Sequence, residues 1–287
     1  MFIILHNPLS KNRKAKRTTK KVVDRFKRNG VPFRLKSLLK IRDIEQYIKD
    51  TPKEIKILLL GGDGTINHFI NNTYDLPIKN EIYLQGNGSG NDFMRSLKKL
   101  HPEKQHIMKL KHNEDIHYYM NGCGMGLDGK ISHLVNQSKR KSKFNYFFNT
   151  LRSFFTYKPR YAEVSIDGKL HTFKKAYLVN ANSGQYIGGG IRLTPKARLD
   201  DDMLDVVVVH RIPRLFLFFI FLTVYFGKHT WFKRYVFYKK AKHVKATMFS
   251  SQIAQCDGES FPNTKEYEVS ASGKYANFKV FDFNKHT

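Results

Sequence analysis

One stretch of the sequence decides the fold: Leu58-Leu59-Leu60-Gly61-Gly62-Asp63-Gly64-Thr65-Ile66-Asn67. The apolar run from Ile55 to Leu60 predicts a buried strand, and the residues from Thr65 onward predict a helix with an apolar face. Glycines let a backbone approach a ligand closely, and a helix N-terminus offers N–H groups and a partial positive charge. The stretch therefore indicates a phosphate-binding loop, although Gly-Gly-Asp-Gly also occurs as a simple turn.

Asp63 is the unusual member of this loop, because a carboxylate repels a phosphate. Two interpretations are open. A divalent cation bridges the carboxylate and the phosphate, or Asp63 only caps the turn.

Composition predicts a folded protein with an anionic partner. The 287 residues are 41% hydrophobic, enough for one large or two moderate domains. Lys and Arg number 51 against 24 Asp and Glu, a formal net charge of +27. This excess favours nucleic acid, an anionic lipid surface or phosphorylated metabolites. The alternative is a solvated, lysine-rich surface.

Two further features concern the compartment. Cys123 and Cys256 lack metal-ligand spacing, which fits a reducing cytoplasm without structural disulfides. Met1 to Leu5 lacks a basic segment and is expected to be a first strand rather than a signal peptide.

The pattern along the chain changes near residue 106. Before it, strands and helices alternate, which predicts a parallel sheet covered by helices. The segments at Asn7, Gly61 and Gly86 all follow strands, so these loops should converge on one edge of the sheet. After it, the expected elements are mostly strands, at 116–121, 161–166, 176–180, 204–210 and 267–271, with one helix at 144–155. We therefore expect α/β plus β, two domains: a Rossmann-like nucleotide-binding domain and a β-sandwich domain with the active site in the cleft between them.

The run from Leu215 to Phe226 is almost purely apolar and has basic residues on both sides. It is too short to span a bilayer, which needs roughly 20 residues. One interpretation is a buried helix of the β domain. The other is an aromatic surface that enters the interface of an anionic membrane, with Phe218 and Phe221 as the inserting rings.

Three polar turns could carry chemistry. In the second glycine loop, Ser89 can donate to a phosphate oxygen, and Asp92 either caps the next helix or fixes the loop. The carboxylates between Asp200 and Asp205 suit Mg²⁺ or Ca²⁺, or form an acidic turn. Asp257 could take a proton from an attacking hydroxyl, although a β-turn is the simpler interpretation.

Together these residues resemble the diacylglycerol kinase catalytic family, the soluble bacterial lipid kinases related to sphingosine and ceramide kinases. The resemblance runs along nearly the whole chain. It rests on five motifs in order: Asn7-Pro8-Leu9-Ser10, Gly61 to Thr65, Gly88 to Phe93 with Arg95, Gly188-Gly189-Gly190 with Pro195, Ala197, Asp201 and Leu204 to Val206, and Asp257-Gly258-Glu259.

The resemblance implies a role for each motif. ATP would be held by Asn7, Gly61, Gly62, Asp63, Gly64, Thr65, Gly88, Ser89 and Asn91. Asp63 would also belong to a Mg²⁺–phosphate network, and Asp201 would help hold a structural Mg²⁺ with backbone carbonyls such as that of Met203. Asp257 would be the general base, with Glu259 beside it on Mg²⁺.

The resemblance also implies domain boundaries. Residues 1–106 would form the nucleotide-binding domain and 107–276 the lipid-substrate domain, and a last strand at about 277–283 would return to the first. Three residues depart from the family pattern. Lys11 replaces a Gly, Gly86 stands where a Pro is common, and Asp202 replaces a Gly in the metal turn.

The sequence thus predicts a cytoplasmic, peripherally membrane-bound kinase that transfers the ATP γ-phosphoryl group to a lipid hydroxyl, most plausibly diacylglycerol. The alternatives are an NAD kinase, whose second motif usually has Asn-Glu where this chain has Asn91-Asp92, and a non-catalytic basic protein that binds anionic lipid or nucleic acid. The kinase interpretation predicts that nucleic acid is not a binding partner. The acceptor is open among diacylglycerol, phosphatidylglycerol, a sphingoid base and a polyprenol, and a homodimer is compatible with the sequence.

Overall fold

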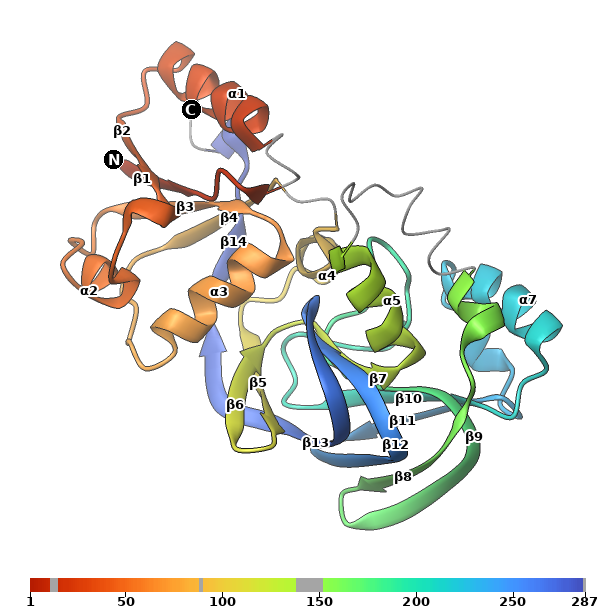
Figure 1. The fold of residues 1–287 in the computed structure, drawn as a ribbon. Helices are drawn as coiled ribbons and strands as arrows, with labels where there is room; N and C mark the ends of the chain where they lie inside the picture. The colour runs from red at the N-terminus through yellow and green to blue at the C-terminus, as the bar shows by residue number, and fades with distance from the viewer. Residues whose placement is uncertain (11–14, 88–89, 138–151, 286–287) are drawn as a thin grey trace.

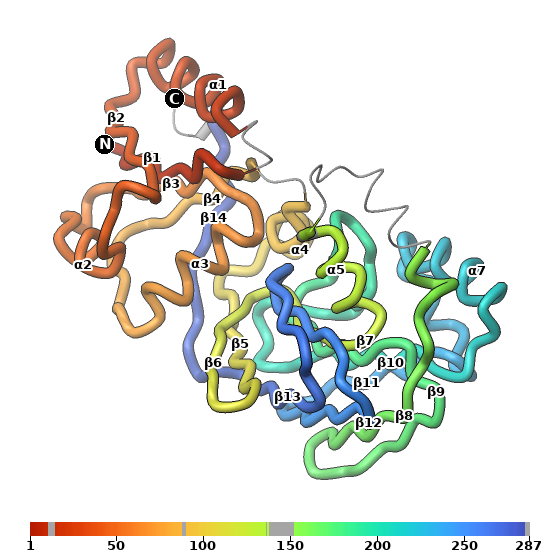
Figure 2. Tube along the Cα trace, viewed as in Figure 1, coloured from red at the N-terminus to blue at the C-terminus, as the bar shows by residue number. Residues whose placement is uncertain are grey.

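The fold was analysed in a computed structural model, which describes residues 1–10, 15–87, 90–137 and 152–285. Two sheets divide the chain into two domains, and both termini lie in the first of them (Figure 1). The trace in Figure 2 follows the chain as it leaves the first domain after α4 and returns to it at the C-terminal end.

The first domain is a five-stranded parallel sheet in the order β14-β4-β3-β1-β2. Its strands are β1 (Phe2–His6), β2 (Phe33–Ser37), β3 (Lys56–Gly61), β4 (Ile82–Gly86) and β14 (Phe278–Val280). Its helices are α1 (Ala15–Arg28), α2 (Ile44–Lys49), α3 (Asp63–Thr73) and α4 (Asp92–Leu100), with short turns η2 (Leu38–Lys40) and η4 (Phe283–Lys285).

The apolar run of β3 explains why this sheet is covered on both faces. Side chains alternate across a strand, so successive residues enter different cores. Leu58 and Leu60 pack with the buried face of α1, whereas Ile57 and Leu59 pack with α2, α3 and α4. β3 therefore lies at the centre of the domain and ends where the glycine loop begins.

The second domain is an antiparallel sheet in the order β11-β10-β9-β7-β12-β13-β5-β6, with β8 joining β12 and β9. Its strands are β5 (Gln105–His112), β6 (Asp115–Tyr119), β7 (Gly122–Gly126), β8 (Arg160–Ile166), β9 (Lys169–Asn182), β10 (Leu204–His210), β11 (Val236–Ala241), β12 (His243–Cys256) and β13 (Glu259–Ala276). It also carries α5 (Leu127–Gln137), α7 (Arg214–Val224) and η3 (Lys228–Trp231). The two-domain fold class is confirmed.

Several elements differ from the sequence prediction. β5, β7, β11, β12 and α5 were not predicted, and β7 shows why. Its sequence, Gly-Cys-Gly-Met-Gly, is typical of a loop, yet every residue is buried between β9 and β12. A Cβ on Gly124 would lie 2.4 Å from the Asn180 side chain, so the glycines make room for neighbouring polar side chains. Most of the predicted helix at 144–155 lies outside the described residues.

The apolar segment forms α7, which is neither fully buried nor fully exposed. Leu217, Ile220, Phe221 and Val224 recur at helical spacing and pack into the core of the second domain. The expectation that Phe221 inserts into a membrane is therefore wrong, because its ring lies 4.8 Å from that of Phe154 and is buried. Phe218 is half-buried. Within the described residues, no helix is long and apolar enough to cross a membrane.

His229 fixes the turn that follows α7. Its side chain is fully buried, and its Nε2 lies 2.9 Å from the carbonyl oxygen of Leu193. Because a carbonyl only accepts, Nε2 carries the proton, and Nδ1 has no hydrogen-bond partner among the described residues. Burial lowers the pKa of His229 to about 4. The imidazole is therefore neutral in the folded protein at ordinary pH.

This burial makes stability depend on pH. Between pH 6.5 and about 4, His229 is protonated in the unfolded state but stays neutral in the folded state. The free energy of unfolding therefore falls as the solution is acidified. The pKa difference corresponds to about 3 kcal/mol. In His229→Gln we expect most of this loss to disappear, measured by urea unfolding at pH 7 and pH 4. The exposed His101→Gln should keep it, and equal losses in both variants would contradict this role.

Candidate functional site

The first glycine loop is shaped by Thr65. A Cβ on Gly61 would lie 2.3 Å from the Cβ of Thr65, so only glycine lets this buried side chain pack against the end of β3. The Thr65 hydroxyl lies 3.3 Å from that of Ser10, and the Asn7 amide donates to it at 3.5 Å. Asn7 also accepts from the Leu9 N–H. The structure thus brings the first loop and the first glycine loop together.

Asp63 binds the next helix. Its carboxylate accepts from the backbone N–H groups of Asp92 at 2.9 Å and Phe93 at 3.1 Å, the first two residues of α4. Burial raises the pKa of Asp63, and these amides together with Arg95 oppose the shift. Of the two interpretations of Asp63, the structure shows a capping role. Asp63 caps the N-terminus of α4, however, and not its own turn.

Asp92 continues the connection into the second domain. It is buried, and its carboxylate accepts from the Arg95 guanidinium and from the backbone N–H of Gly189, both at 2.6 Å. Burial and the charge of Asp63 raise the pKa of Asp92 to about 7. Gly188, Gly189 and Gly190 all have positive φ, which only glycine adopts freely. This triple-glycine turn thereby presents its amide to Asp92.

Of the second glycine loop, Gly88 and Ser89 lie outside the described residues. Gly90 and Asn91 follow them, and Asn91 has a left-handed backbone with φ of 54°. The Asn91 side chain folds over Gly86, where a Cβ would meet it at 3.1 Å. A side chain at position 86 would therefore require the Asn91 side chain to shift.

Asp257 organises the start of β7. It lies in the turn between β12 and β13, and its carboxylate accepts from the backbone N–H groups of Met120 at 3.0 Å, Asn121 at 3.2 Å and Gly122 at 2.9 Å. The Asn67 amide of α3 approaches it at 3.5 Å. Burial raises the pKa of Asp257 to about 6, while the amides oppose the shift. At neutral pH it is ionised, yet more basic than an ordinary Asp.

A cavity of about 150 Å³ opens beside Asp257. Its lining consists of Asn67, His68, Asn71, His117, Cys256, Glu259 and Phe261. Asn67 and Asn71 also donate to the carbonyl of Tyr118, and Asn71 accepts from its N–H, which binds α3 to β6. Sequence reasoning missed both asparagines; the signal was their spacing of four along one helix face. Glu259 is exposed at the cavity and Phe261 lies across from His117.

The predicted metal residues lie in different places. Asp201 pairs with Lys240 through one oxygen at 2.6 Å, and its other oxygen is buried without a hydrogen-bond partner. Asp205 differs, because Tyr238 donates to one of its oxygens and the Lys240 ammonium lies 4.0 Å from the other. Arg198 pairs with Asp200 at 2.8 Å, and Met203 is half-buried. Within the described residues, no group of three His, Cys, Asp or Glu could hold an ion. The unpartnered oxygen of Asp201 fits a cation, whose remaining ligands would be carbonyls.

Comparison with known proteins follows the same division into two domains. Residues 1–119 match the diacylglycerol kinase catalytic domain. Residues 122–270, more than half of the chain, match the YegS C-terminal NAD kinase beta sandwich-like domain. These matches and the fold define a two-domain kinase. The chain belongs to the diacylglycerol kinase catalytic family and is a lipid kinase of that family, as its motifs predicted.

Relatives and solved structures agree with this assignment. The chain is 24% identical to the diacylglycerol kinase of Bacillus subtilis, over 89% of this chain and 88% of that one. It is also 24% identical to the diacylglycerol kinase of Staphylococcus saprophyticus, with the same coverage. A diacylglycerol kinase crystal structure from Bacillus anthracis shares the fold, with a TM-score of 0.64, 18% identity and 97% and 96% coverage. An NAD kinase from Archaeoglobus fulgidus in complex with ATP is more distant, with a TM-score of 0.51, 13% identity and 100% and 95% coverage.

The cap that Asp63 provides can be tested without substrate. Asp63→Ala leaves two amides of α4 without their acceptor, and losing an N-cap costs about 1 kcal/mol. We expect a decrease of about 1–2 kcal/mol in the free energy of unfolding, measured by urea unfolding in EDTA. Asp75→Ala, in an exposed ion pair with Lys274, is the control and should change little. Equal stability of the two variants would refute the cap.

Proposed function

We propose that this lipid kinase transfers the γ-phosphoryl group of ATP to a hydroxyl of diacylglycerol. One observation carries the proposal: α3 begins at the glycine loop and, one turn later, reaches Asp257 through Asn67. A nucleotide bound to the loop and the proton acceptor Asp257 would therefore both lie beside the first turn of α3. Both glycine loops and Asp257 support a site between the domains.

Each group would have a simple role. The loop of Gly61 to Thr65, with Asn7 and Ser10, would hold the phosphates of ATP. Phosphoryl transfer depends mainly on positioning and charge stabilisation. When bound, Mg²⁺ would supply neutralisation of phosphate charge, and Asp201 with the carbonyl of Met203 would hold a structural ion. The unpartnered oxygen of Asp201 supports this assignment.

Asp257 is well placed to accept the proton. A carboxylate offers about four lone-pair sites, and three are occupied by amides within 3.2 Å. The fourth, on Oδ2, accepts only a long contact of 3.5 Å from the amide of Asn67, a residue that lines the polar cavity, and an entering hydroxyl would displace this contact. An acceptor hydroxyl entering there would lose its proton to Asp257 while its oxygen bonds to phosphorus and ADP leaves. The glycerol part of the acceptor would occupy the cavity.

The acceptor can be identified directly. The protein is incubated with ATP carrying a labelled γ-phosphate and a total lipid extract, and the labelled product is identified by mass spectrometry. The proposal expects phosphatidic acid. If a different lipid is labelled, the identity of the acceptor is revised and the lipid kinase activity stands. Labelled NADP⁺ from added NAD⁺, with no labelled lipid, would contradict the proposal.

The role of Asp257 predicts a specific kinetic change. Asp257→Asn keeps the shape of the side chain but removes its basicity, and loss of general-base catalysis lowers kcat by about 10²–10⁴-fold. The KM for ATP should change little, since the nucleotide loop is untouched. The melting temperature should fall modestly, because the amide can accept fewer of the backbone N–H groups.

Asp167→Asn is a matched control for this structural loss. Asp167 also lies in a turn with positive φ, and it accepts from the N–H groups of Lys242 and His243. It should lose stability without losing kcat. If Asp257→Asn retains kcat, Asp257 is a structural residue and the reaction has another base.

The structural cation gives a prediction that does not involve activity. An ion that binds only the folded state raises its stability, so Mg²⁺ should raise the melting temperature of the native chain relative to EDTA. Asp201→Ala should abolish that increase. Asp202→Ala should retain it, because Asp202 is exposed and pairs with Lys242 at 3.8 Å. The same increase in all three proteins would exclude Asp201 as a ligand.

A further inference from the structure

One exposed stripe of α7 has no role in the site described above. We define the α7 patch as Leu215, Phe219, Leu222, Phe226 and Trp231, which are 78%, 58%, 44%, 72% and 72% exposed. Leu215, Phe219 and Leu222 are spaced by four and three residues, so they follow one face of α7, and Phe226 follows in the turn after the helix. Trp231 extends this face at η3.

The other face of the helix holds it in place. Leu217, Ile220, Phe221 and Val224 are buried in the second domain. The buried His229 fixes η3 through Leu193. The helix that carries the exposed rings is therefore packed through its opposite face, and within the described residues no member of the α7 patch belongs to that core. A soluble domain rarely leaves so many large apolar side chains on one stripe unless the surface binds something.

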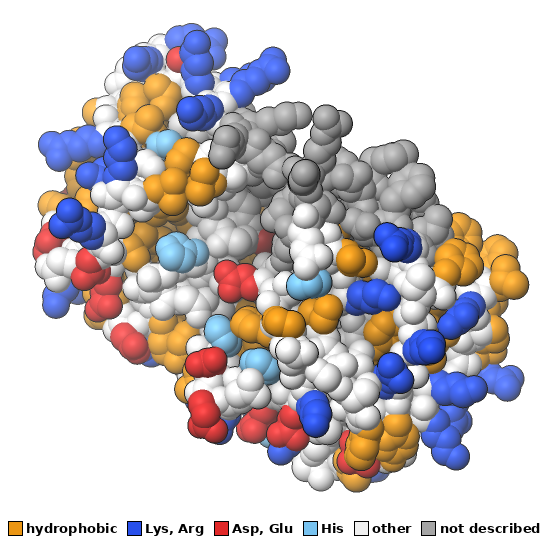
Figure 3. Space-filling model, viewed as in Figure 1, with side chains coloured by type: hydrophobic (Ala, Val, Ile, Leu, Met, Phe, Trp, Pro, Cys, Tyr) orange, Lys and Arg blue, Asp and Glu red, His pale blue; other side chains and the backbone are white. Residues whose placement is uncertain are grey.

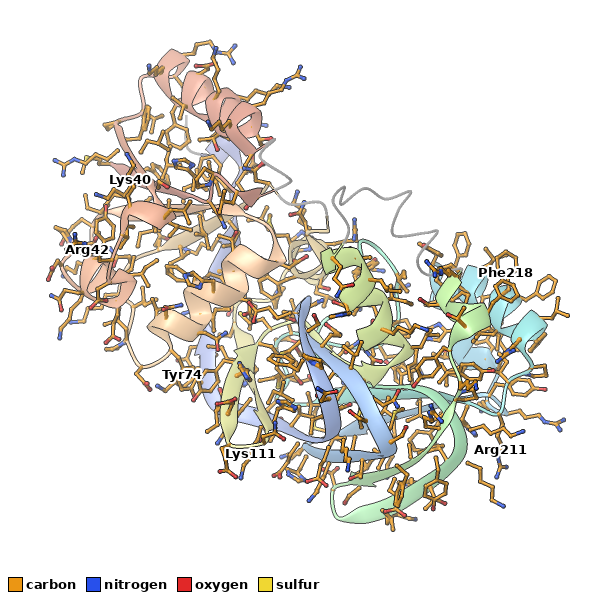
Figure 4. The ribbon with its side chains drawn as sticks, in the orientation of Figure 1. Lys40, Arg42, Tyr74, Lys111, Arg211 and Phe218 are labelled. Carbon is orange, nitrogen blue, oxygen red and sulfur yellow. The ribbon has the colours of Figure 1, made fainter. Side chains whose placement is uncertain are left out.

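The charge around the patch indicates what binds there. The segment 206–256 contains no Asp or Glu. Basic residues flank the patch in the sequence on both sides: Arg211, Arg214, Lys228, Lys233 and Arg234. Further along the segment, Lys240, Lys242 and Lys245 are instead paired with Asp201, Asp202 and Glu266. Lys228 lies over the Trp231 ring at 5.4 Å. In Figure 3 the apolar side chains at the right-hand end lie next to Lys and Arg side chains, and Figure 4 places Phe218 and Arg211 at this end.

We propose that the α7 patch docks the kinase on an anionic lipid bilayer, with its apolar side chains in the interface and the basic residues at the headgroups. Exposed Phe, Leu and Trp side chains with Lys and Arg beside them enter the bilayer interface in this way. Each basic residue near the surface adds electrostatic attraction. This proposal rests on the proposed function for the reason why the protein would dock, which is access to a lipid acceptor. Binding to vesicles does not itself require kinase activity.

Co-sedimentation of the full chain with vesicles tests the apolar part. The vesicles are phosphatidylcholine with or without phosphatidylglycerol. Phe219→Ser with Phe226→Ser should weaken binding to the anionic vesicles by about tenfold or more, since each inserted ring contributes through its buried area. The control pair, Leu170→Ser with Phe249→Ser, replaces side chains that are 59% and 63% exposed elsewhere in the domain. It should bind as the native chain does.

A second pair of variants tests the charged part. Arg211→Glu with Lys233→Glu should weaken binding to anionic vesicles and reduce its dependence on salt. Lys40→Glu with Arg42→Glu makes the same change of charge at the opposite end of the molecule (Figure 4) and should have a smaller effect. Equal effects of the two pairs would show that net charge alone drives binding, and would overturn the patch as the docking surface.

Activity separates this proposal from the proposed function. On vesicles, the Phe219→Ser with Phe226→Ser variant should be slower than the native chain, and on a short-chain diacylglycerol in solution the two should be equal. If no lipid is phosphorylated while the patch still governs vesicle binding, only the proposed function fails. The docking proposal is overturned if the native chain does not bind anionic vesicles. It is also overturned if ultracentrifugation shows a dimer that the two serines dissociate, because the patch is then a subunit interface.

Discussion

The structure depends on partly or fully buried carboxylates that accept hydrogen bonds from backbone N–H groups where the two domains meet. Asp63 binds the first amides of α4, Asp92 binds the triple-glycine turn, and Asp257 binds the start of β7. A buried amide without an acceptor costs about as much as a lost hydrogen bond. Because each carboxylate connects segments far apart in sequence, the glycine loops and the turn of Asp257 are held in one fixed arrangement.

This arrangement has an electrostatic consequence. Three carboxylates share a small, partly dehydrated region, and burial and mutual repulsion raise the pKa of Asp92 to about 7 and of Asp257 to about 6. The same groups that join the domains therefore become more basic than ordinary aspartates. The basic groups of the chain lie mostly on its surface, so the centre that would hold the phosphates combines backbone amides with buried acids. Such a centre suits a bound cation with its nucleotide better than a nucleotide alone.

Local patterns were sufficient to predict the first domain. Consecutive residues determine the apolar run of β3, its glycine loop and the alternation of strands and helices. All three features are present in the structure. The contacts of Asp63 and Asn67 could not be predicted in this way, because their partners lie 29 and 51 residues further along the chain. β7 could not be predicted for another reason: Gly122 and Gly124 make room for Asn182 and Asn180 of β9, a requirement that is visible only once the two strands are paired. The sequence of α7 is too uniformly hydrophobic to show which face of the helix is buried. The buried face is set by packing against the core of the second domain.

Hydrogen–deuterium exchange of the backbone amides tests the central claim most directly. In the native chain the amides of residues 120–122 should exchange slowly, since Asp257 accepts from all three. In Asp257→Asn they should exchange about tenfold faster, while the amides of residues 92 and 93, held by Asp63, should keep their native rates. Unchanged exchange at residues 120–122 would contradict the claim that this carboxylate organises the junction between the domains.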